Sequence, residues 1–411
     1  MIRLTGFHRP RPTTACSGLT VTAMERPDRL RFLLATPTGQ KLVPLVAKGD
    51  AVEPFTVLAR WEDRPYAICP VKGTVTEFTT ACDAHGHQDM PVVVITVDAD
   101  QPSEPRHFAS AREAVDAAGI LIMGCTGLAM NQCLPTATAK ALAVTAMDLY
   151  PGVHSAASLL ARHGEACVKA AALAGSLVGV TRTVLVLPDG ADAAPLKEAS
   201  AAHKVEIHHA PVRYPLALPP LLIKRLEERL GITCAVMPLS TAFAAYKAAQ
   251  GTPPSAVMVT VTGHTADPRA MLAPLGATVG QVLSAAGQKV EEGDKVVTAG
   301  PLTGQALCNL ETPVEAGLSG LHVIPRKDVV ETACDPCINC GVCLEVCPTG
   351  VQVHMIGRYA QYNIFDRAQG LGIKSCIDCG LCASVCPSHR PLLQWINLTR
   401  SQMAAAEVRA Q

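Results

Sequence analysis

Short apolar runs separated by Gly and Pro residues characterise the first part of the chain. This punctuation is typical of small all-β units, in which short strands alternate with tight turns. Two of the turns, KGDAV and PVKGTV, favour one compact barrel. We therefore predict a β barrel-sandwich (lipoyl-like) domain over residues 1–105. Its strands are expected at residues 30–35, 41–46, 71–78 and 92–97.

The pattern changes over residues 106–252, where apolar strand-like runs alternate with longer stretches of helical periodicity. Such alternation predicts a parallel α/β sheet, a class of fold that commonly binds nucleotides. Strands are expected at residues 120–123, 183–187, 204–209 and 235–238. Helices are expected near residues 136–146, 155–178, 191–202, 219–230 and 240–249.

Two further domains complete a chain of 411 residues, which is too long for one ordinary core. Residues 253–325 contain the strand-like run VTVTG and turns at Gly293-Asp294 and Gly300-Pro301, which indicate a small α+β domain. Residues 326–411 contain dense cysteine motifs. The predicted fold class is therefore multidomain α/β, with the cysteine domain at the C-terminal end.

Charge and composition exclude several classes of function. Lys plus Arg and Asp plus Glu number 35 each, so no overall field attracts nucleic acid or an acidic membrane surface. The 17 cysteines and an N-terminal sequence without a secretory apolar stretch predict a reducing cytoplasm. Glycines and polar residues interrupt the longest uncharged run, residues 117–139, so we expect no membrane-spanning segment.

Eight cysteines form two runs of identical spacing, CINCGVCLEVCP and CIDCGLCASVCP. Thiolates at these gaps can surround a [4Fe–4S] cube, and in this bacterial pattern the fourth cysteine ligates the other cluster. The spacing therefore predicts two [4Fe–4S] clusters in a helical ferredoxin-like domain. The ligands of cluster 1 are expected to be Cys337, Cys340, Cys343 and Cys386. The ligands of cluster 2 are expected to be Cys376, Cys379, Cys382 and Cys347.

Zinc is the alternative occupant of such cysteines, but zinc sites favour two CxxC pairs with a longer spacer between them. Gly341 and Gly380 follow the second cysteine of each run, where a loop around a bulky cube leaves little room for side chains. Cys334 precedes the first run and is expected to be a bystander. Two cubes side by side form an electron relay, so no catalytic residue is expected among these cysteines.

The order of these domains, with VTVTG, GPLTG, GLSGL and the doubled cysteine runs, resembles RnfC, the peripheral subunit of the Rnf ion-translocating oxidoreductase. The resemblance covers nearly the whole chain. It implies a β-grasp-like (SLBB) fold for residues 253–325 and an FMN and NADH site in the α/β domain. It also implies a peripheral position on the cytoplasmic face of the inner membrane, beside membrane subunits of the complex.

Both marks of the FMN and NADH site are incomplete in this sequence. The family motif GxGGxGFPT is reduced to Gly124 and Gly127, and of the second motif's two acids only Asp148 remains, with Tyr150 in place of the other. The departure argues against NADH binding and leaves FMN in doubt. Gly124, Gly127 and Asp148 are the residues to examine, and an ordinary strand-to-helix turn would also explain them.

Other candidate sites have simpler explanations. Lys72 could carry lipoate or biotin, but a solvated turn lysine explains it more simply. The segment CDAHGHQD at residues 82–89 contains metal-ligand types, yet such residues are common in polar hairpin loops. His208 and His209 are expected at the end of an edge strand. Aromatic residues between the cysteine runs, among them His354, are expected to pack.

The leading interpretation is an electron-transfer subunit of a membrane-associated complex, with little activity alone. Its soluble donor or acceptor could be a ferredoxin, a cytochrome or a flavoprotein. An FMN-dependent NADH dehydrogenase or corrinoid reductase is the first alternative, and bound flavin would favour it. A docking scaffold with structural clusters is the second.

Overall fold

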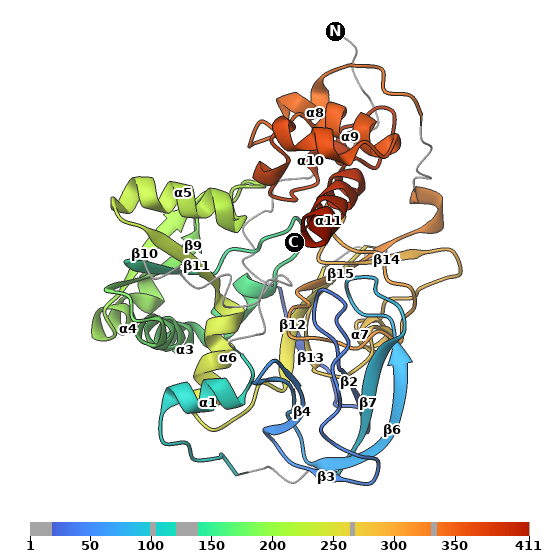
Figure 1. Ribbon diagram of the computed structural model, residues 1–411. Helices are drawn as coiled ribbons and strands as arrows, with labels where there is room; N and C mark the ends of the chain where they lie inside the picture. Colours follow the sequence, from blue (N-terminus) through green and yellow to red (C-terminus); the bar gives the residue numbers. More distant parts are fainter. Residues whose placement is uncertain (1–18, 99–103, 121–138, 264–267, 330–334, 411) are drawn as a thin grey trace. The chain divides into compact units, whose positions relative to one another are not determined.

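The computed structural model describes residues 19–98, 104–120, 139–263, 268–329 and 335–410. The chain divides into two compact units, which are described separately below (Figure 1). The described part of the larger unit extends to Arg326, and the smaller unit consists of Pro301–Thr303 together with the residues from Lys327 onward. None of the helices formed by the described residues combines the length and apolar character that crossing a bilayer requires.

The N-terminal part of the larger unit is an antiparallel sheet of strand order β2-β7-β6-β3 beside a two-stranded β4-β5 ribbon. The strands are β2 (Arg29–Leu33), β3 (Ala51–Val52), β4 (Thr56–Trp61), β5 (Arg64–Cys69), β6 (Gly73–Ala81) and β7 (Met90–Val97). The prediction of a strand at residues 41–46 is wrong. Only single bridges form there, from Lys41 to Ala35 and from Pro44 to Ala59, because a proline cannot donate to a strand ladder.

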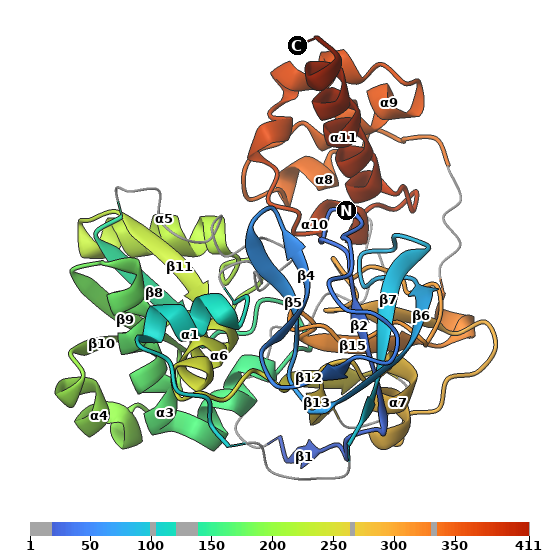
Figure 2. The ribbon, with the colours of Figure 1, turned by 60° about the horizontal axis from the view of Figure 1, so that its bottom comes forward.

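A five-stranded mixed sheet of order β1-β13-β12-β15-β14 lies beside this β unit (Figure 2). It consists of β1 (Val21–Ala23), β12 (Ala256–Thr262), β13 (Arg269–Pro274), β14 (Lys295–Thr298) and β15 (Gly320–Ile324), with helix α7 (Val279–Ala285). β1 comes from the N-terminal part of the chain and pairs in parallel with β13. One hydrophobic core joins both sheets, with Leu30 and Ile95 on one side and Val259 and Val323 on the other. The N-terminal and third sequence segments thus fold around a common core.

A four-stranded parallel sheet of order β10-β9-β8-β11 forms the α/β part of the larger unit. Its strands are β8 (Ala141–Thr145), β9 (Arg182–Pro188), β10 (Val205–Ala210) and β11 (Cys234–Pro238). Its helices are α1 (Ala111–Ala117), α3 (Ser155–Val178), η1 (Ala194–Leu196), α4 (Lys197–Ala202), α5 (Pro219–Leu230) and α6 (Leu239–Ala249). Figure 1 shows α3 and α6 on one face of this sheet and α5 on the other.

Strand β8 replaces the helix that the sequence pattern predicts near residues 136–146, so that prediction is wrong. Leu142 and Val144 enter the core beneath α3 and α6, whereas Ala141 and Ala143 face the core beneath α5. A parallel strand covered on both faces is apolar at every position and shows no alternation. Its alanines, which favour helices intrinsically, therefore give a misleading local signal.

The smaller unit is helical. It contains α8 (Val342–Glu345), α9 (Val353–Gln361), η3 (Phe365–Leu371), η4 (Ile373–Ser375), α10 (Leu381–Ser384) and α11 (Leu392–Ala410), and η2 (Arg326–Asp328) lies at the border of the two units. Helices α9 and α11 pack closely at Gly357, where an added Cβ would lie 3.0 Å from the Trp395 ring. Val351, Ile356 and Ile396 form the core of this unit together with cysteines of both runs.

Substitution of Gly175 by Ala is expected to lower the free energy of unfolding by about 1–3 kcal/mol, the usual range for overpacking a core. Gly175 is buried where α3 packs against β9, and an added Cβ would overlap the Thr183 hydroxyl and lie 3.1 Å from the Thr183 Cβ. Chemical denaturation followed by far-UV circular dichroism measures the change.

Gly164→Ala on the same helix is the matched control. Its Cβ would meet only the flexible end of the Leu196 side chain, so the variant should gain up to about 1 kcal/mol of helix propensity or remain neutral. Equal unfolding curves for wild type and Gly175→Ala would contradict the proposed tight contact between α3 and β9.

Candidate iron–sulfur site

The two cysteine runs adopt the same local conformation in the smaller unit. Asn339 and Asp378, between the first two cysteines of each run, both have left-handed backbones, with φ of 57° and 55°. Gly341 and Gly380 are also left-handed, with φ of 78° and 70°, and they begin helices α8 and α10. Each CxxC loop therefore turns twice through a conformation that glycine adopts without strain.

The backbone conformation alone accounts for Gly341, whereas at Gly380 lack of space acts as well, because an added Cβ would overlap the Leu302 carbonyl oxygen. A Cβ on Gly341 would meet no protein atom within 4 Å, so crowding by the chain itself does not require this glycine. Its φ of 78° does, because an L side chain is strained there.

Four cysteines from both runs line one cavity. The first three, Cys337, Cys340 and Cys343, come from the first run, and the fourth, Cys386, comes from the end of the second run. The side chain of His354 on α9 lines the same cavity. Its Nδ1 atom is buried without a hydrogen-bond partner among the described residues. Four cysteines around one space are the ligand set that a [4Fe–4S] cube requires, and the sulfides of such a cube could accept a hydrogen bond from the imidazole.

The effects of neighbouring thiols on each other's pKa indicate the same arrangement, in which a cysteine of one run lies beside cysteines of the other. Burial raises the pKa of Cys343, and the neighbouring thiols of Cys340, Cys386 and Cys337 raise it further. Burial likewise raises the pKa of Cys379, and the thiol of Cys347 from the first run acts in the same direction. Cys386 thus lies near the first three cysteines of the first run, and Cys347 lies near Cys379 of the second run.

Buried thiols of this kind stay protonated at neutral pH without a metal. Burial raises the pKa of Cys376 to about 11 and that of Cys382 to about 12. Iron deprotonates a coordinating thiol, so cluster assembly at these positions would release protons.

The described residues contain no group of three or more His, Cys, Asp or Glu side chains converging on a single metal ion.

Polar contacts hold the loops around the two sets of thiols. The Val351 N–H donates to Cys347 Sγ at 3.3 Å. Arg358 donates to Asn339 Oδ1 at 3.0 Å in the first run, and Arg400 pairs with Asp378 in the second run. Hydrogen bonds to sulfur and charges near it are the features through which a protein sets the reduction potential of a cluster.

Asp148, the described member of the predicted FMN and NADH site, contacts the N-terminus of α3. Its Oδ1 accepts the Ala156 N–H at 2.8 Å and the Ser155 hydroxyl at 3.4 Å, and Oδ2 accepts the Ala157 N–H at 3.4 Å. The backbone N–H groups in the first turn of a helix have no acceptor within the helix itself, so they need one from outside it. Asp148 thus stabilises the turn that joins β8 to α3, and Gly124 and Gly127 lie outside the described residues.

Most of the remaining candidates belong to the larger unit. The segment 82–89 forms the β6–β7 hairpin loop, and buried Asp83 accepts hydrogen bonds from the His85 and His87 backbone N–H groups at 2.9 and 2.8 Å. His208 and His209 lie on the edge strand β10, as predicted. Lys72 is exposed immediately before β6, and Cys334 lies outside the described residues.

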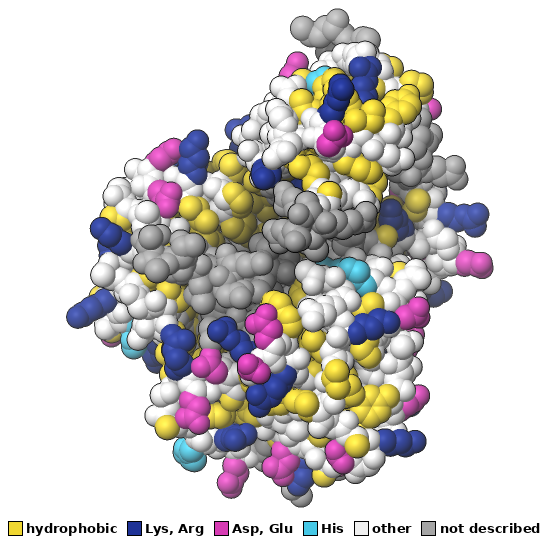
Figure 3. Space-filling model, in the orientation of Figure 1, with side chains coloured by type: hydrophobic (Ala, Val, Ile, Leu, Met, Phe, Trp, Pro, Cys, Tyr) yellow, Lys and Arg dark blue, Asp and Glu magenta, His cyan; other side chains and the backbone are white. Residues whose placement is uncertain are grey.

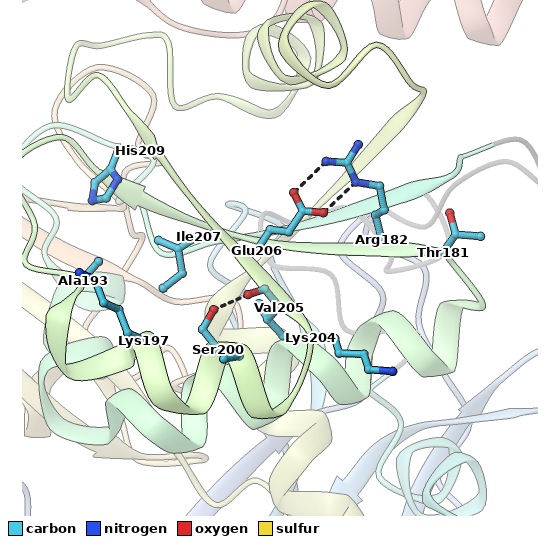
Figure 4. A pocket seen from close by; sticks show the side chains of 11 residues that line it. Thr181, Arg182, Ala193, Lys197, Ser200, Lys204, Val205, Glu206, Ile207 and His209 are labelled. Atoms are coloured by element: carbon cyan, nitrogen blue, oxygen red, sulfur yellow. Dashed lines mark hydrogen bonds and ion pairs between the residues drawn. The ribbon is translucent and has the colours of Figure 1, made fainter.

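A shallow hollow beside strand β10 is lined by residues of β9, β10 and α4 (Figure 4). Arg182 on β9 donates two hydrogen bonds to the Glu206 carboxylate on β10, each 2.8 Å long. Both carboxylate oxygens of Glu206 are therefore engaged within the protein. The pair links two neighbouring strands and offers no free acid or base to a ligand.

Comparisons with known proteins agree with the cysteine geometry. A family model described as a 4Fe-4S dicluster domain matches residues 336–390. The RnfC component of the ion-translocating oxidoreductase complex of Rhodobacter capsulatus is 24% identical over 436 residues, covering 98% of this chain and 83% of the relative. The chain is a homologue of the RnfC component of these complexes. The predicted resemblance to the RnfC family is therefore confirmed, as is an iron–sulfur domain at the C-terminal end.

Further relatives have related names. The corresponding component of the Na(+)-translocating ferredoxin:NAD(+) oxidoreductase complex of Acetobacterium woodii is 25% identical, over 97% of this chain and 96% of the relative. Its counterpart in the proton-translocating ferredoxin:NAD(+) oxidoreductase complex of Clostridium ljungdahlii is 31% identical over 51% of this chain and 49% of the relative.

Solved structures show a weaker likeness to an NAD+-reducing [NiFe]-hydrogenase. The H2-reduced form is 16% identical with a TM-score of 0.46, and the comparison covers 73% of this chain and 66% of that chain. The air-oxidised form is 19% identical with a TM-score of 0.42, over 63% and 50%.

Replacement of Asp148 by Asn is expected to remove one component of the pH dependence of stability. Burial raises the pKa of Asp148 to about 7, although the hydrogen bonds from α3 oppose part of the rise. Because the folded pKa lies above the unfolded value, the contribution of this group is greatest at low pH and is lost as pH rises through about 7. Melting temperatures of both proteins should therefore be compared between about pH 4.5 and 8, because the loss falls between the unfolded and the folded pKa.

Wild type is expected to lose stability relative to Asp148→Asn as the pH rises across that range. Glu165→Gln on the same helix serves as control, because this exposed carboxylate pairs with Lys169 and its pKa is lowered. A difference between wild type and Asp148→Asn that stays constant with pH would show that Asp148 does not titrate there.

Proposed function

We propose that the chain is the peripheral electron-transfer subunit of an ion-translocating oxidoreductase complex. In this proposal its smaller unit holds two [4Fe–4S] clusters and passes single electrons between a soluble carrier and membrane subunits. The observation that carries the proposal is the meeting of Cys386 with Cys337, Cys340 and Cys343 around one cavity. The near-full-length similarity to RnfC proteins supports it independently.

In this proposal the eight cysteines divide into the two ligand sets expected from their spacing. Cluster 1 would be held by Cys337, Cys340, Cys343 and Cys386. Cluster 2 would be held by Cys376, Cys379, Cys382 and Cys347. Bound cubes supply one-electron oxidation and reduction without rearranging bonds in a substrate.

The two sets differ in their access to solvent. Cys340 of the first set is exposed, whereas Cys379 and Cys382 of the second set are buried. An exposed ligand brings a cluster close to the surface, where a soluble carrier can exchange an electron with it. We therefore assign the Cys337 set to exchange with an external partner.

The larger unit serves as a docking body in this proposal. We infer a barrel-sandwich fold for its N-terminal sheet and a β-grasp-like (SLBB) fold for the sheet that contains β12 and β15. With Asp148 occupied by the first turn of α3, neither NADH nor FMN is assigned to the α/β part. We further propose that the chain lies on the cytoplasmic face of the membrane, has little activity alone and accepts electrons from, or gives them to, a ferredoxin, a cytochrome or a flavoprotein.

The distribution of surface charge agrees with recognition by shape and local contacts. On the face shown in Figure 3, basic and acidic side chains are interspersed, without a large area of one sign among the described residues. A surface of this kind gives no long-range steering toward nucleic acid. Docking to membrane subunits would then depend on short-range packing.

Anaerobic purification is expected to yield about eight irons and eight sulfides per chain, four of each in every cube. The same preparation should contain no flavin, and NADH should not change its absorbance. Iron, sulfide, zinc and flavin are quantified chemically, and the cubes are identified by electron paramagnetic resonance (EPR) after dithionite reduction. Zinc at these cysteines, or thiols free of metal, would refute the proposal, and stoichiometric FMN reduced by NADH would favour a dehydrogenase instead.

A variant of one cysteine tests whether the second run supplies the fourth ligand of the first cluster. Cys386→Ser is expected to reduce the iron content to about four per chain, because it removes one corner of the first set only. Cys308→Ser is the control, since Cys308 is an exposed cysteine of the larger unit. Full iron content in Cys386→Ser would show that this cysteine is not required for cluster binding.

A further inference from the structure

The structural equivalence of the two runs extends beyond their cysteines. Gly350 and His389, three residues after the last cysteine of each run, both have left-handed backbones, with φ of 69° and 45°. The residues that follow them are Val351 and Arg390. Each of these accepts, through its carbonyl, a 2.8 Å hydrogen bond from the N–H two residues later. Val351 and Arg390 therefore occupy the same position in two copies of one local fold.

This equivalent position is apolar in one copy and charged in the other. Val351 is 1% exposed and belongs to the core of the smaller unit. Arg390 is 4% exposed and is one of the residues that line the cavity of Cys337, Cys340, Cys343 and Cys386. A permanently charged guanidinium in such a place requires strong local support, because burial removes its hydration.

The support for Arg390 comes from neutral groups. Its Nη1 donates to the Asp335 carbonyl at 2.9 Å, and its Nη2 donates to Gln361 Oε1 at 2.8 Å. The guanidinium carbon lies 4.4 Å from the centre of the Trp395 ring. Among the described residues no carboxylate forms an ion pair with Arg390, so its positive charge is not neutralised by that part of the protein.

His354 adds a second polar group to the same cavity. Its Nδ1 is the buried atom without a partner that was described above. An imidazole that carries its proton on Nδ1 can donate to a sulfur of a cluster in this cavity. Arg390 and His354 thus both belong to the residues that line the cavity of the first set of cysteines.

The other charges near the two runs would not all raise the reduction potential of the same cluster. Exposed Asp335 lies near the first run, and exposed Lys374 precedes the second run. Solvent and salt screen these exposed charges strongly. In the second run Asp378 is neutralised by Arg400. The buried charge of Arg390 therefore dominates the difference between the sets.

We propose that Arg390 and His354 raise the reduction potential of cluster 1 above that of cluster 2. This inference rests on the proposed function. Adding an electron makes a cluster more negative, and a nearby positive charge or N–H donor stabilises that reduced form. One electron given by a soluble low-potential carrier would then come to rest on the Cys337 set. Transfer from the Cys376 set to the Cys337 set is the favourable direction.

A redox titration followed by EPR tests this inference on the full chain. Wild type is expected to show two separate midpoint potentials. Arg390→Gln should lower only the higher of the two, changing the ratio of reduced to oxidised cluster at fixed ambient potential at least tenfold, which is about 59 mV for one electron. Arg390→Lys keeps the charge and should retain most of the wild-type value.

Arg358→Gln is the matched control, because it removes the same charge from a solvent-accessible side chain bonded to Asn339 of the first run. It should shift either midpoint much less than Arg390→Gln does. If Arg390→Gln fails to assemble clusters, His354→Leu provides the second measurement and should lower the same higher midpoint.

The results separate this inference from the proposed function. Iron and sulfide content test cluster binding and are measured before any titration. With about eight irons present, two equal midpoints in wild type would overturn the inference, as would a fall of the lower midpoint in Arg390→Gln. Unchanged midpoints in both Arg390→Gln and His354→Leu would also overturn it.

Discussion

The meeting of Cys386 with the cysteines of the first run is the constraint on which the smaller unit depends. Because one thiol of the second run lies beside three thiols of the first, neither run can complete its set alone. The helices between the runs must therefore pack before the thiols come together. Close contact of α9 with α11 at Gly357, and a core that contains both cysteines and aliphatic residues, are consequences of this interlocking.

The larger unit is held together in a comparable way by segments distant in sequence. β1 pairs with β13, and the N-terminal sheet shares one core with the sheet of β12 and β15. Asp148 connects the end of β8 to the start of α3 through hydrogen bonds to the helix N-terminus. A carboxylate used in this way supports the fold itself.

Local sequence patterns predicted those features whose causes are local. The ends of α3 and α5 agree with the periodicity over residues 155–178 and 219–230, and cysteine spacing indicated the conformation shared by the two runs. The pattern failed at β8, where burial on both faces removes alternation, and at residues 41–46, where Pro44 prevents a ladder. Pairing of β1 with β13 depends on tertiary contacts that no short window of sequence contains.

Arg390 escaped the sequence analysis for a different reason. The spacing of the cysteines is the same in both runs. The properties of two clusters can nevertheless differ because of the other residues, which are not the same in the two runs. Aligning the runs on their cysteines places Arg390 opposite Val351 and Asp378 opposite Asn339, and only the structure shows which of these charges is buried. Ligand spacing fixes where two similar cubes can assemble. In the proposed relay, a single buried charge beside one cube would make the two electronically unequal.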